Sequence, residues 1–177
     1  MNPKSHNIFS QLSRFELEIE RLEGRILEVE TRLTTLLEIE RNHLVRVKNH
    51  EELSDDFVQS GLTYHDLSPE KAWRLYKNPD LNFFLIDVTS KNFNSNKRLP
   101  DALHLPWEDF RDRFIEIGSR TTPLFIISED GTNSVLACEF LVKHGFYNCN
   151  NISGGYKYWV GFRLEVAKGD PRQGESA

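Results

Sequence analysis

The sequence predicts an α/β fold, a parallel sheet flanked by helices, that is preceded by a long N-terminal coiled-coil helix. Two observations predict this class. Apolar residues between positions 8 and 36 recur at alternating spacings of four and three, which is the repeat of a coiled-coil helix. Beyond residue 63, short apolar runs alternate with helical segments. Strands that alternate with helices form parallel sheets covered on both faces.

The composition limits the class of protein. The chain has 177 residues, enough for one domain and an extension, and its 38% hydrophobic content indicates that part of it is a solvated helix. A net charge of −5 argues against a nucleic-acid surface. No apolar run approaches the roughly 20 residues that span a bilayer, and residues 1–7 have no signal-peptide pattern. We therefore expect a cytoplasmic protein that binds neither nucleic acid nor membranes.

The first predicted element is a coiled-coil helix over residues 7–52. Its apolar seam consists of Ile8, Leu12, Phe15, Ile19, Leu22, Ile26, Val29, Leu33 and Leu36. Burying such a seam contributes on the order of 15 to 25 kcal/mol before chain entropy is subtracted. We therefore expect self-association, most simply a homodimer, and the sequence leaves a parallel or antiparallel arrangement open. The alternative is a helix that folds back on its own C-terminal domain.

The apolar pattern broadens after Leu36, so the coil frays, changes register or becomes a bundle or docking face. His43 and His50 occupy extrapolated seam positions seven residues apart. They either mark the end of the seam or meet their symmetry mates, which would give a pH switch or an incidental metal site.

A linker over residues 53–63, rich in Ser, Asp and Gly, separates the helix from a domain over residues 64–163. In that domain we expect strands at 83–88, 102–105, 123–127 and 148–152, and helices at 68–77, 106–117, 134–144 and 156–162. Ser68 and Pro69 supply the cap and first residue of one helix. The last residues, 164–177, are nearly free of apolar side chains and are expected to be disordered.

One strand-turn-helix segment is the candidate site. Its loop comprises Ser128, Glu129, Asp130, Gly131, Thr132 and Asn133. Gly131 permits a tight turn and Ser134 can cap the following helix. Such a turn directs backbone N–H groups into one concavity, which favours an anion and lowers the pKa of a thiol placed there. Asp87 ends another predicted strand and is expected beside this loop.

Residues 67–162 resemble a rhodanese-like domain. Four segments in order carry the resemblance: a strand that ends in an aspartate (85–88), Leu-Pro-Asp-Ala-Leu-His-Leu-Pro (99–106), the six-residue loop before Ser134, and Ile-Ser-Gly-Gly with Trp159 (152–159). The resemblance implies a sulfurtransferase fold in which the first loop residue, a cysteine, carries a persulfide. Here that residue is Ser128, whose hydroxyl lacks the acidity and nucleophilicity that sulfur exchange uses.

Other departures from the family point the same way. Glu129 and Asp130 place negative charge where the family holds an anion. We interpret Arg98, with Arg111 and Arg113, as a solvated basic face, and Asp87 as an acceptor for backbone N–H groups. We therefore expect a catalytically inactive, dimeric module that binds an unknown protein partner, without catalytic residue, cofactor or metal.

Two alternatives remain open at this point. Cys138 or Cys149 could carry a persulfide in place of Ser128, although both are expected to pack in the core. The loop over residues 128–133 could instead hold a neutral or cationic small molecule and act as a ligand sensor.

Overall fold

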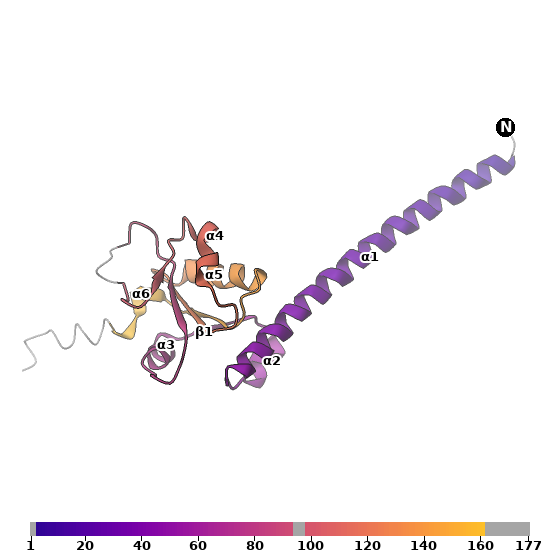
Figure 1. The fold of residues 1–177 in the computed structure, drawn as a ribbon. Coiled ribbons are helices and arrows are strands. Elements are labelled where there is room, and N and C mark those ends of the chain that lie inside the picture. The colour runs from indigo at the N-terminus through magenta and orange to yellow at the C-terminus, as the bar shows by residue number, and fades with distance from the viewer. Residues whose placement is uncertain (1–2, 94–97, 162–177) are drawn as a thin grey trace, which may run out of the picture. The chain divides into compact units, whose positions relative to one another are not determined.

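The computed structural model describes residues 3–93 and 98–161. The chain divides into two units, residues 1–37 and 38–177. Helix α1 (Pro3–Lys48) forms the described part of the first unit, and its last eleven residues belong to the second unit (Figure 1). The predicted tail, 164–177, lies outside the described residues.

Helix α1 begins and ends four residues earlier than the predicted segment, 7–52. It begins at Pro3 and ends at Lys48. His50 has a left-handed backbone, with φ of 61°, and its N–H donates to the Val47 carbonyl. This turn ends the helix before His50, so the heptad register that would have aligned His43 with His50 does not extend to the second histidine.

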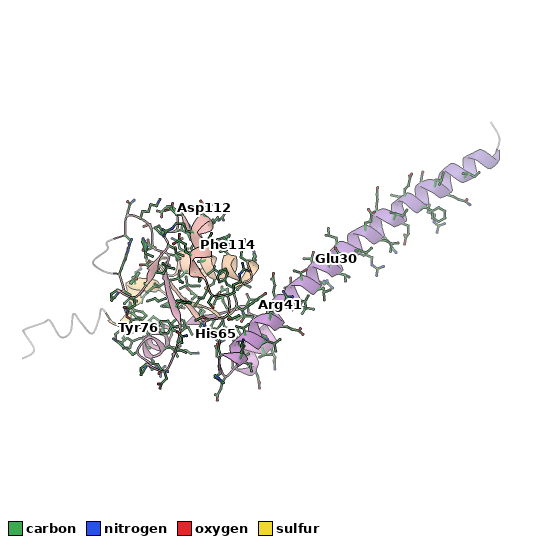
Figure 2. The ribbon with its side chains drawn as sticks, in the orientation of Figure 1. Glu30, Arg41, His65, Tyr76, Asp112 and Phe114 are labelled. Atoms are coloured by element: carbon green, nitrogen blue, oxygen red, sulfur yellow. The ribbon has the colours of Figure 1, made fainter. Side chains whose placement is uncertain are left out.

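The nine seam residues of the first unit are all exposed on the single chain, from 44% for Leu22 to 64% for Phe15. Charged residues occupy other faces of the helix, among them Glu30 (Figure 2). Ion pairs join Arg21 to Glu18 at 3.0 Å and Arg32 to Glu28 at 2.7 Å. Exposed pairs of this kind support a helix only slightly, so the apolar seam is the principal unburied feature of this unit.

The second unit contains a five-stranded sheet in the order β1-β5-β4-β2-β3, and every pairing is parallel. The strands are β1 (Tyr64–Leu67), β2 (Phe84–Asp87), β3 (Leu103–His104), β4 (Leu124–Ile127) and β5 (Cys149–Ile152). The predicted parallel α/β class is confirmed. Strand β1 was not predicted, because a four-residue edge strand with a histidine and an aspartate has little apolar signal; it forms through backbone pairing with β5.

The remaining helices are α2 (Asp55–Ser60), α3 (Pro69–Tyr76), α4 (Phe110–Arg113), the 3₁₀ turn η2 (Phe114–Ile117), α5 (Thr132–Lys143) and α6 (Gly155–Tyr158). Helix α2 lies inside the segment that we predicted as a linker. It forms there because the Ser54 hydroxyl accepts the Phe57 N–H at 3.3 Å and Phe57 is buried. The helix predicted over 106–117 begins only at Phe110 and tightens into η2.

Two apolar clusters cover opposite faces of the sheet. Residues of α4, η2 and α5 pack on one face, and residues of α3 and α6 pack on the other (Figure 1). Trp159 and Phe110 are the largest apolar side chains buried in these clusters. Among the described residues, none of the helices combines the length and apolarity needed to cross a bilayer.

Candidate functional site

The candidate loop begins where β4 ends. Strand β4 lies between β2 and β5, and its last residue, Ile127, pairs with Asp87 at the end of β2. The chain then turns through residues 128–131 into helix α5. The sheet therefore places Ser128 and Asp87 at the same carboxyl edge, as the sequence predicted.

The Ser128 hydroxyl is fully buried and its hydrogen bonds are complete. Its Oγ accepts the N–H groups of Gly131 at 3.1 Å and Ser134 at 3.3 Å, and it lies 3.1 Å from the Ser134 hydroxyl. Since Ser134 Oγ donates to the Gly131 carbonyl at 3.1 Å, the Ser128 proton goes to Ser134 Oγ. The N–H groups of Gly131 and Ser134, which could otherwise bind an anion, thus donate to a neutral hydroxyl.

Ser134 is not the cap of helix α5, contrary to the sequence prediction. The helix begins two residues earlier, at Thr132, and its N-terminal capping position is Gly131, with φ of 96°. Ser134 therefore lies in the first turn of α5. Its buried hydroxyl links the two ends of the loop, because it bonds to the Ser128 hydroxyl and the Gly131 carbonyl. The left-handed conformation of Gly131 allows the chain to enter the helix earlier than the polar residues suggested.

The Gly154–Gly155 segment covers this loop. The Tyr156 N–H donates to the Ser128 carbonyl and the Lys157 N–H to the Glu129 carbonyl, both at 2.9 Å. A Cβ atom on Gly155 would lie 2.0 Å from the Ser128 carbonyl oxygen. Gly155 is therefore required by the close approach of two backbones, whereas a Cβ atom on Gly154 would meet the Tyr158 side chain.

The two loop carboxylates do not face one common site. Glu129 Oε1 accepts the Ser90 N–H at 2.6 Å and ties the loop to the segment after β2. Asp130 Oδ1 accepts the Thr132 N–H at 3.0 Å, and this bond holds the pKa of Asp130 below its ordinary value. Only Asp130 is exposed, so the negative charge of the loop is directed to solvent by one residue.

Asp87 accepts hydrogen bonds from two directions, as expected of a structural carboxylate. Its Oδ1 accepts the Thr89 N–H at 2.8 Å, and its Oδ2 accepts the Tyr156 hydroxyl at 3.0 Å. Burial, and then the charge of Asp87, raises the pKa of Tyr156. Tyr156 was not predicted as a partner of Asp87, because the sequence marks it only by its place directly after the Gly-Gly pair.

The prediction that Arg98 belongs to a solvated basic face is wrong. Its guanidinium lies 3.7 Å from Asp87 Oδ2 and donates to the carbonyls of Ser90 and Phe93. Arg111 is exposed, and Arg113 pairs with Glu116 at 2.7 Å. Arg98 differs from these two because it balances the charge of a fully buried aspartate.

Both cysteines are core residues. Cys138 lies on α5, Cys149 is the first residue of β5, and neither side chain is exposed. Burial raises the pKa of Cys138 well above its ordinary value and that of Cys149 to about 12. A thiol must ionise to attack sulfur, so neither position favours a persulfide.

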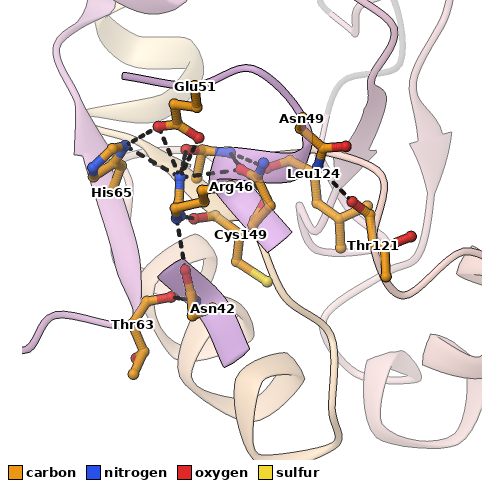
Figure 3. Close-up of polar contacts among 11 residues, drawn as sticks. Asn42, Arg46, Asn49, Glu51, Thr63, His65, Thr121, Leu124 and Cys149 are labelled. Atoms are coloured by element: carbon orange, nitrogen blue, oxygen red, sulfur yellow. Dashed lines mark hydrogen bonds and ion pairs between the residues drawn. The ribbon is translucent and has the colours of Figure 1, made fainter. Parts of the chain in front are cut away.

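A second buried polar cluster surrounds Arg46, near the amino ends of β1 and β5 (Figure 3). Arg46 lies near the end of α1 and is fully buried. Its partners are Asn42 at 2.7 Å, Glu51 at 3.0 Å, His65 at 3.2 Å, Asn148 at 3.0 Å, Asn150 at 3.1 Å and the Cys149 carbonyl at 2.6 Å. We call these residues the Arg46 cluster.

The Arg46 cluster explains why the seam pattern broadens after Leu36. Residues 38–48 pack in the second unit, and half-buried His43 lies against the Phe57 ring with centroids 5.4 Å apart. His43 is thus a packing residue of its own chain. Burial, and next the charge of Arg46, lowers its pKa. Among the residues that the structure describes, no group of three or more His, Cys, Asp or Glu is placed to hold a metal ion.

Comparison with known proteins identifies the second unit. The model of the rhodanese-like domain matches residues 68–161. The thiosulfate sulfurtransferase GlpE of Actinobacillus pleuropneumoniae serotype 3 is 29% identical over 107 residues, which are 59% of this chain and 96% of that protein. The GlpE of Pseudomonas syringae pv. syringae is 28% identical over 93 residues, 52% of this chain and 84% of the relative.

Two solved structures share the fold. An uncharacterized protein from Saccharomyces cerevisiae aligns with a TM-score of 0.50 and 21% identity, over 58% of this chain and 95% of that chain. The reduced CoADR-RHD of Bacillus anthracis also aligns with a TM-score of 0.50, at 20% identity, over 68% of this chain and 24% of that protein. The family model begins at residue 68, so helix α1 and the Arg46 residue lie outside the matched segment.

Proposed function

The chain belongs to the rhodanese-like domain family, and we propose that it acts as a catalytically inactive, dimeric module that binds a protein partner. The observation that carries this proposal is the Ser128 hydroxyl, at the loop position where the resemblance places the sulfur-carrying cysteine. It is buried, neutral and satisfied by the loop itself.

The hydrogen bonds of Ser128 argue against a nucleophilic role. A serine nucleophile needs an adjacent base, whereas Ser128 Oγ is bonded to Gly131 N–H, Ser134 N–H and the Ser134 hydroxyl. None of these groups takes up a proton near neutral pH. The Ser128 carbonyl is also bonded to Tyr156. The loop therefore has neither a sulfur atom nor a means of activating the oxygen in its place.

The relatives named thiosulfate sulfurtransferase favour the competing function, sulfur transfer, at 28–29% identity. The two functions separate in a thiosulfate:cyanide assay of wild type, Ser128→Cys and Ser128→Ala. We expect wild type and Ser128→Ala to show the same background rate. We expect Ser128→Cys to gain the mass of one sulfur atom after incubation with thiosulfate, because a thiolate at that position receives the N–H groups of Gly131 and Ser134.

Appreciable turnover by wild type would contradict the proposal. The same incubation of wild type, followed by peptide mass spectrometry, tests the two core cysteines. A sulfur adduct on Cys138 or Cys149 would favour a persulfide carrier instead.

The dimeric part of the proposal rests on the seam of helix α1. Nine apolar side chains at coiled-coil spacing are exposed on one chain, and an identical seam on a second copy is the simplest partner. The pair Ile19→Lys and Ile26→Lys should convert the protein from dimer to monomer in sedimentation equilibrium, because two buried charges per helix would face an apolar seam.

The matched control is the pair Leu17→Lys and Leu27→Lys. These leucines are 67% and 65% exposed and lie outside the seam, so the doubly substituted chain should remain a dimer. A wild-type protein that sediments with the mass of one chain at micromolar concentration would overturn the dimer.

A further inference from the structure

The part of helix α1 that belongs to the second unit has two different faces. Asn42 and Arg46 lie on one face, where they are fully buried and hydrogen-bonded to carbonyls of that unit (Figure 3). Leu44 and Val47 lie on the opposite face, since successive residues of a helix are about 100° apart. They are 68% and 58% exposed. Packing within its own chain therefore leaves an apolar face of this segment uncovered.

This uncovered face continues the apolar seam of the first unit. After Leu33, alternating steps of four and three residues lead to four exposed positions, Leu37, Glu40, Leu44 and Val47. The original register would pass through His43, which instead packs against Phe57. We call the nine seam residues together with Leu37, Leu44 and Val47 the extended seam. It covers residues 8–47, with the charged Glu40 inside it.

The charges beside the extended seam discriminate between the two orientations of a helix pair. An antiparallel pair that buries the whole extended seam places Ile8 opposite Val47 of the second copy. The positions that flank the seam then bring Glu23 to Glu30 of the second copy, and Arg25 to Arg32 of the second copy. By symmetry each contact occurs twice. This arrangement therefore repeats like-charge contacts and gains no opposite-charge contact at these positions.

A parallel pair in register combines the same charges differently. Arg25 then faces Glu30 of the second copy, again twice. Among the described residues, neither side chain has an ion pair within its own chain. The unfavourable contact is Glu18 with Glu23, but Glu18 is already paired with Arg21 of its own helix at 3.0 Å, which offsets the repulsion. The balance of charge therefore favours the parallel pair.

We propose that two copies of this chain pair in parallel and in register along the extended seam, as far as Val47. This inference rests on the dimeric part of the proposed function, for which it specifies the surface and the orientation. Glu40 meets its own copy in this pair, which costs stability and helps to specify the register. A parallel pair carries both second units at one end of the coil. A partner that contacts both copies gains apparent affinity from the two attachments.

Disulfide cross-linking of the full chain tests the orientation and the extent of the pair. Leu22→Cys and Leu44→Cys are made separately and oxidised with diamide. Both should give a covalent dimer on a non-reducing gel, because each residue meets its own copy in a parallel pair. In the antiparallel pair the two copies of residue 44 lie about 50 Å apart along the helix, whereas a disulfide needs Cα atoms within about 7 Å.

Leu17→Cys is the control for the cross-links. Leu17 is 67% exposed but lies outside the seam, so it should give no covalent dimer. The native thiols of Cys138 and Cys149 are buried and should not react. Equal cross-linking of Leu17→Cys and Leu44→Cys, or a cross-link at residue 22 without one at residue 44, would overturn the proposal.

Charge reversal gives a second test, in which the two orientations predict opposite signs. In the parallel pair Arg25→Glu meets Glu30 of the second copy, so the dissociation constant from sedimentation equilibrium should rise roughly two- to fivefold. Adding Glu30→Arg should restore it. In the antiparallel pair Arg25→Glu would face Arg32 and tighten the dimer, which would overturn the proposal. Arg14→Glu, on an outer position of the coil, should change little.

The two levels of the proposal fail in different ways. A wild type that sediments as one chain refutes the dimeric part of the proposed function. A dimeric wild type without a cross-link at residue 44 refutes the parallel extended pair alone.

Discussion

Two of the polar clusters buried in the second unit differ in how far apart their members lie along the chain. The Ser128 loop satisfies its hydroxyl with groups at most six residues away. The Arg46 cluster brings an arginine from α1 to acceptors more than a hundred residues later, Asn148, Cys149 and Asn150. A neutral local cluster and a charged long-range cluster should therefore fail in different ways when one member is removed.

The largest effect is expected at Arg46. Replacement by methionine removes the buried charge that pairs with Glu51 and one donor to each of the buried oxygens of Asn148 and Asn150. Breaking a buried ion pair of this kind costs about 3 to 5 kcal/mol in the free energy of unfolding. Urea unfolding measures it through tryptophan fluorescence, since Trp73, Trp107 and Trp159 all belong to the second unit.

The control for Arg46→Met is Arg41→Met. Arg41 is exposed on the same helix, within the same unit (Figure 2), so its loss should change stability by less than about 0.5 kcal/mol. Similar losses at the two positions would show that the Arg46 contacts contribute nothing beyond general helix charge.

A smaller effect is expected at Ser134. Ser134→Ala removes the acceptor of the Ser128 hydroxyl and the donor to the Gly131 carbonyl, both buried. The Ser128 hydroxyl is then left without its acceptor, whereas the Gly131 carbonyl keeps the Val135 N–H at 3.3 Å. Leaving a buried hydroxyl unpaired costs about 1 to 3 kcal/mol, again measured by urea unfolding. Ser60→Ala is the control, because Ser60 is exposed and its hydroxyl donates only to the Phe57 carbonyl one turn earlier. A Ser134 loss no larger than the Ser60 loss would contradict the described network.

The smallest effect concerns pH and Glu51. Burial acts to raise the pKa of Glu51, but the hydrogen bond with His65 and the charge of Arg46 outweigh it and hold the pKa below 4.5. A carboxylate with a lower pKa in the folded state stabilises fully above the unfolded value, and this stabilisation is lost as pH falls through the folded value. Stability should therefore decline below about pH 4.5 partly through Glu51.

As the pH is lowered, the urea midpoint of unfolding should consequently fall less steeply for Glu51→Gln than for wild type. Glu52→Gln, at the exposed neighbouring residue, should follow the wild-type curve. Identical acid profiles for the two variants would remove Glu51 as a source of the pH dependence.

The same contrast, between contacts that are local in sequence and contacts between distant residues, explains what the sequence could predict. Apolar runs mark strands β2 and β4, and Ser68-Pro69 marks the start of helix α3; these are local signals. The position of the Ser128 loop followed from the strand and helix on either side. The parallel sheet and the family were predicted correctly because these segments occur in a recognisable order.

The sequence could not predict features that depend on distant partners. Arg46 resembles any charged residue on a helix until Asn148 and Asn150 are brought to it, and Arg98 appears solvated until Asp87 is placed beside it. Ser134 was mistaken for a helix cap because the left-handed Gly131 moves the helix start. The coiled-coil partner stays a prediction.

The contact between Gly155 and the Ser128 carbonyl has a practical consequence. Tyr156 N–H and the glycine hold the backbone of residue 128 in place irrespective of the atom at its side-chain tip. Exchanging that oxygen for sulfur is thus a one-atom experiment on a fixed frame. The protein therefore offers a reference in which the reactivity of oxygen and of sulfur can be compared within the same surrounding fold.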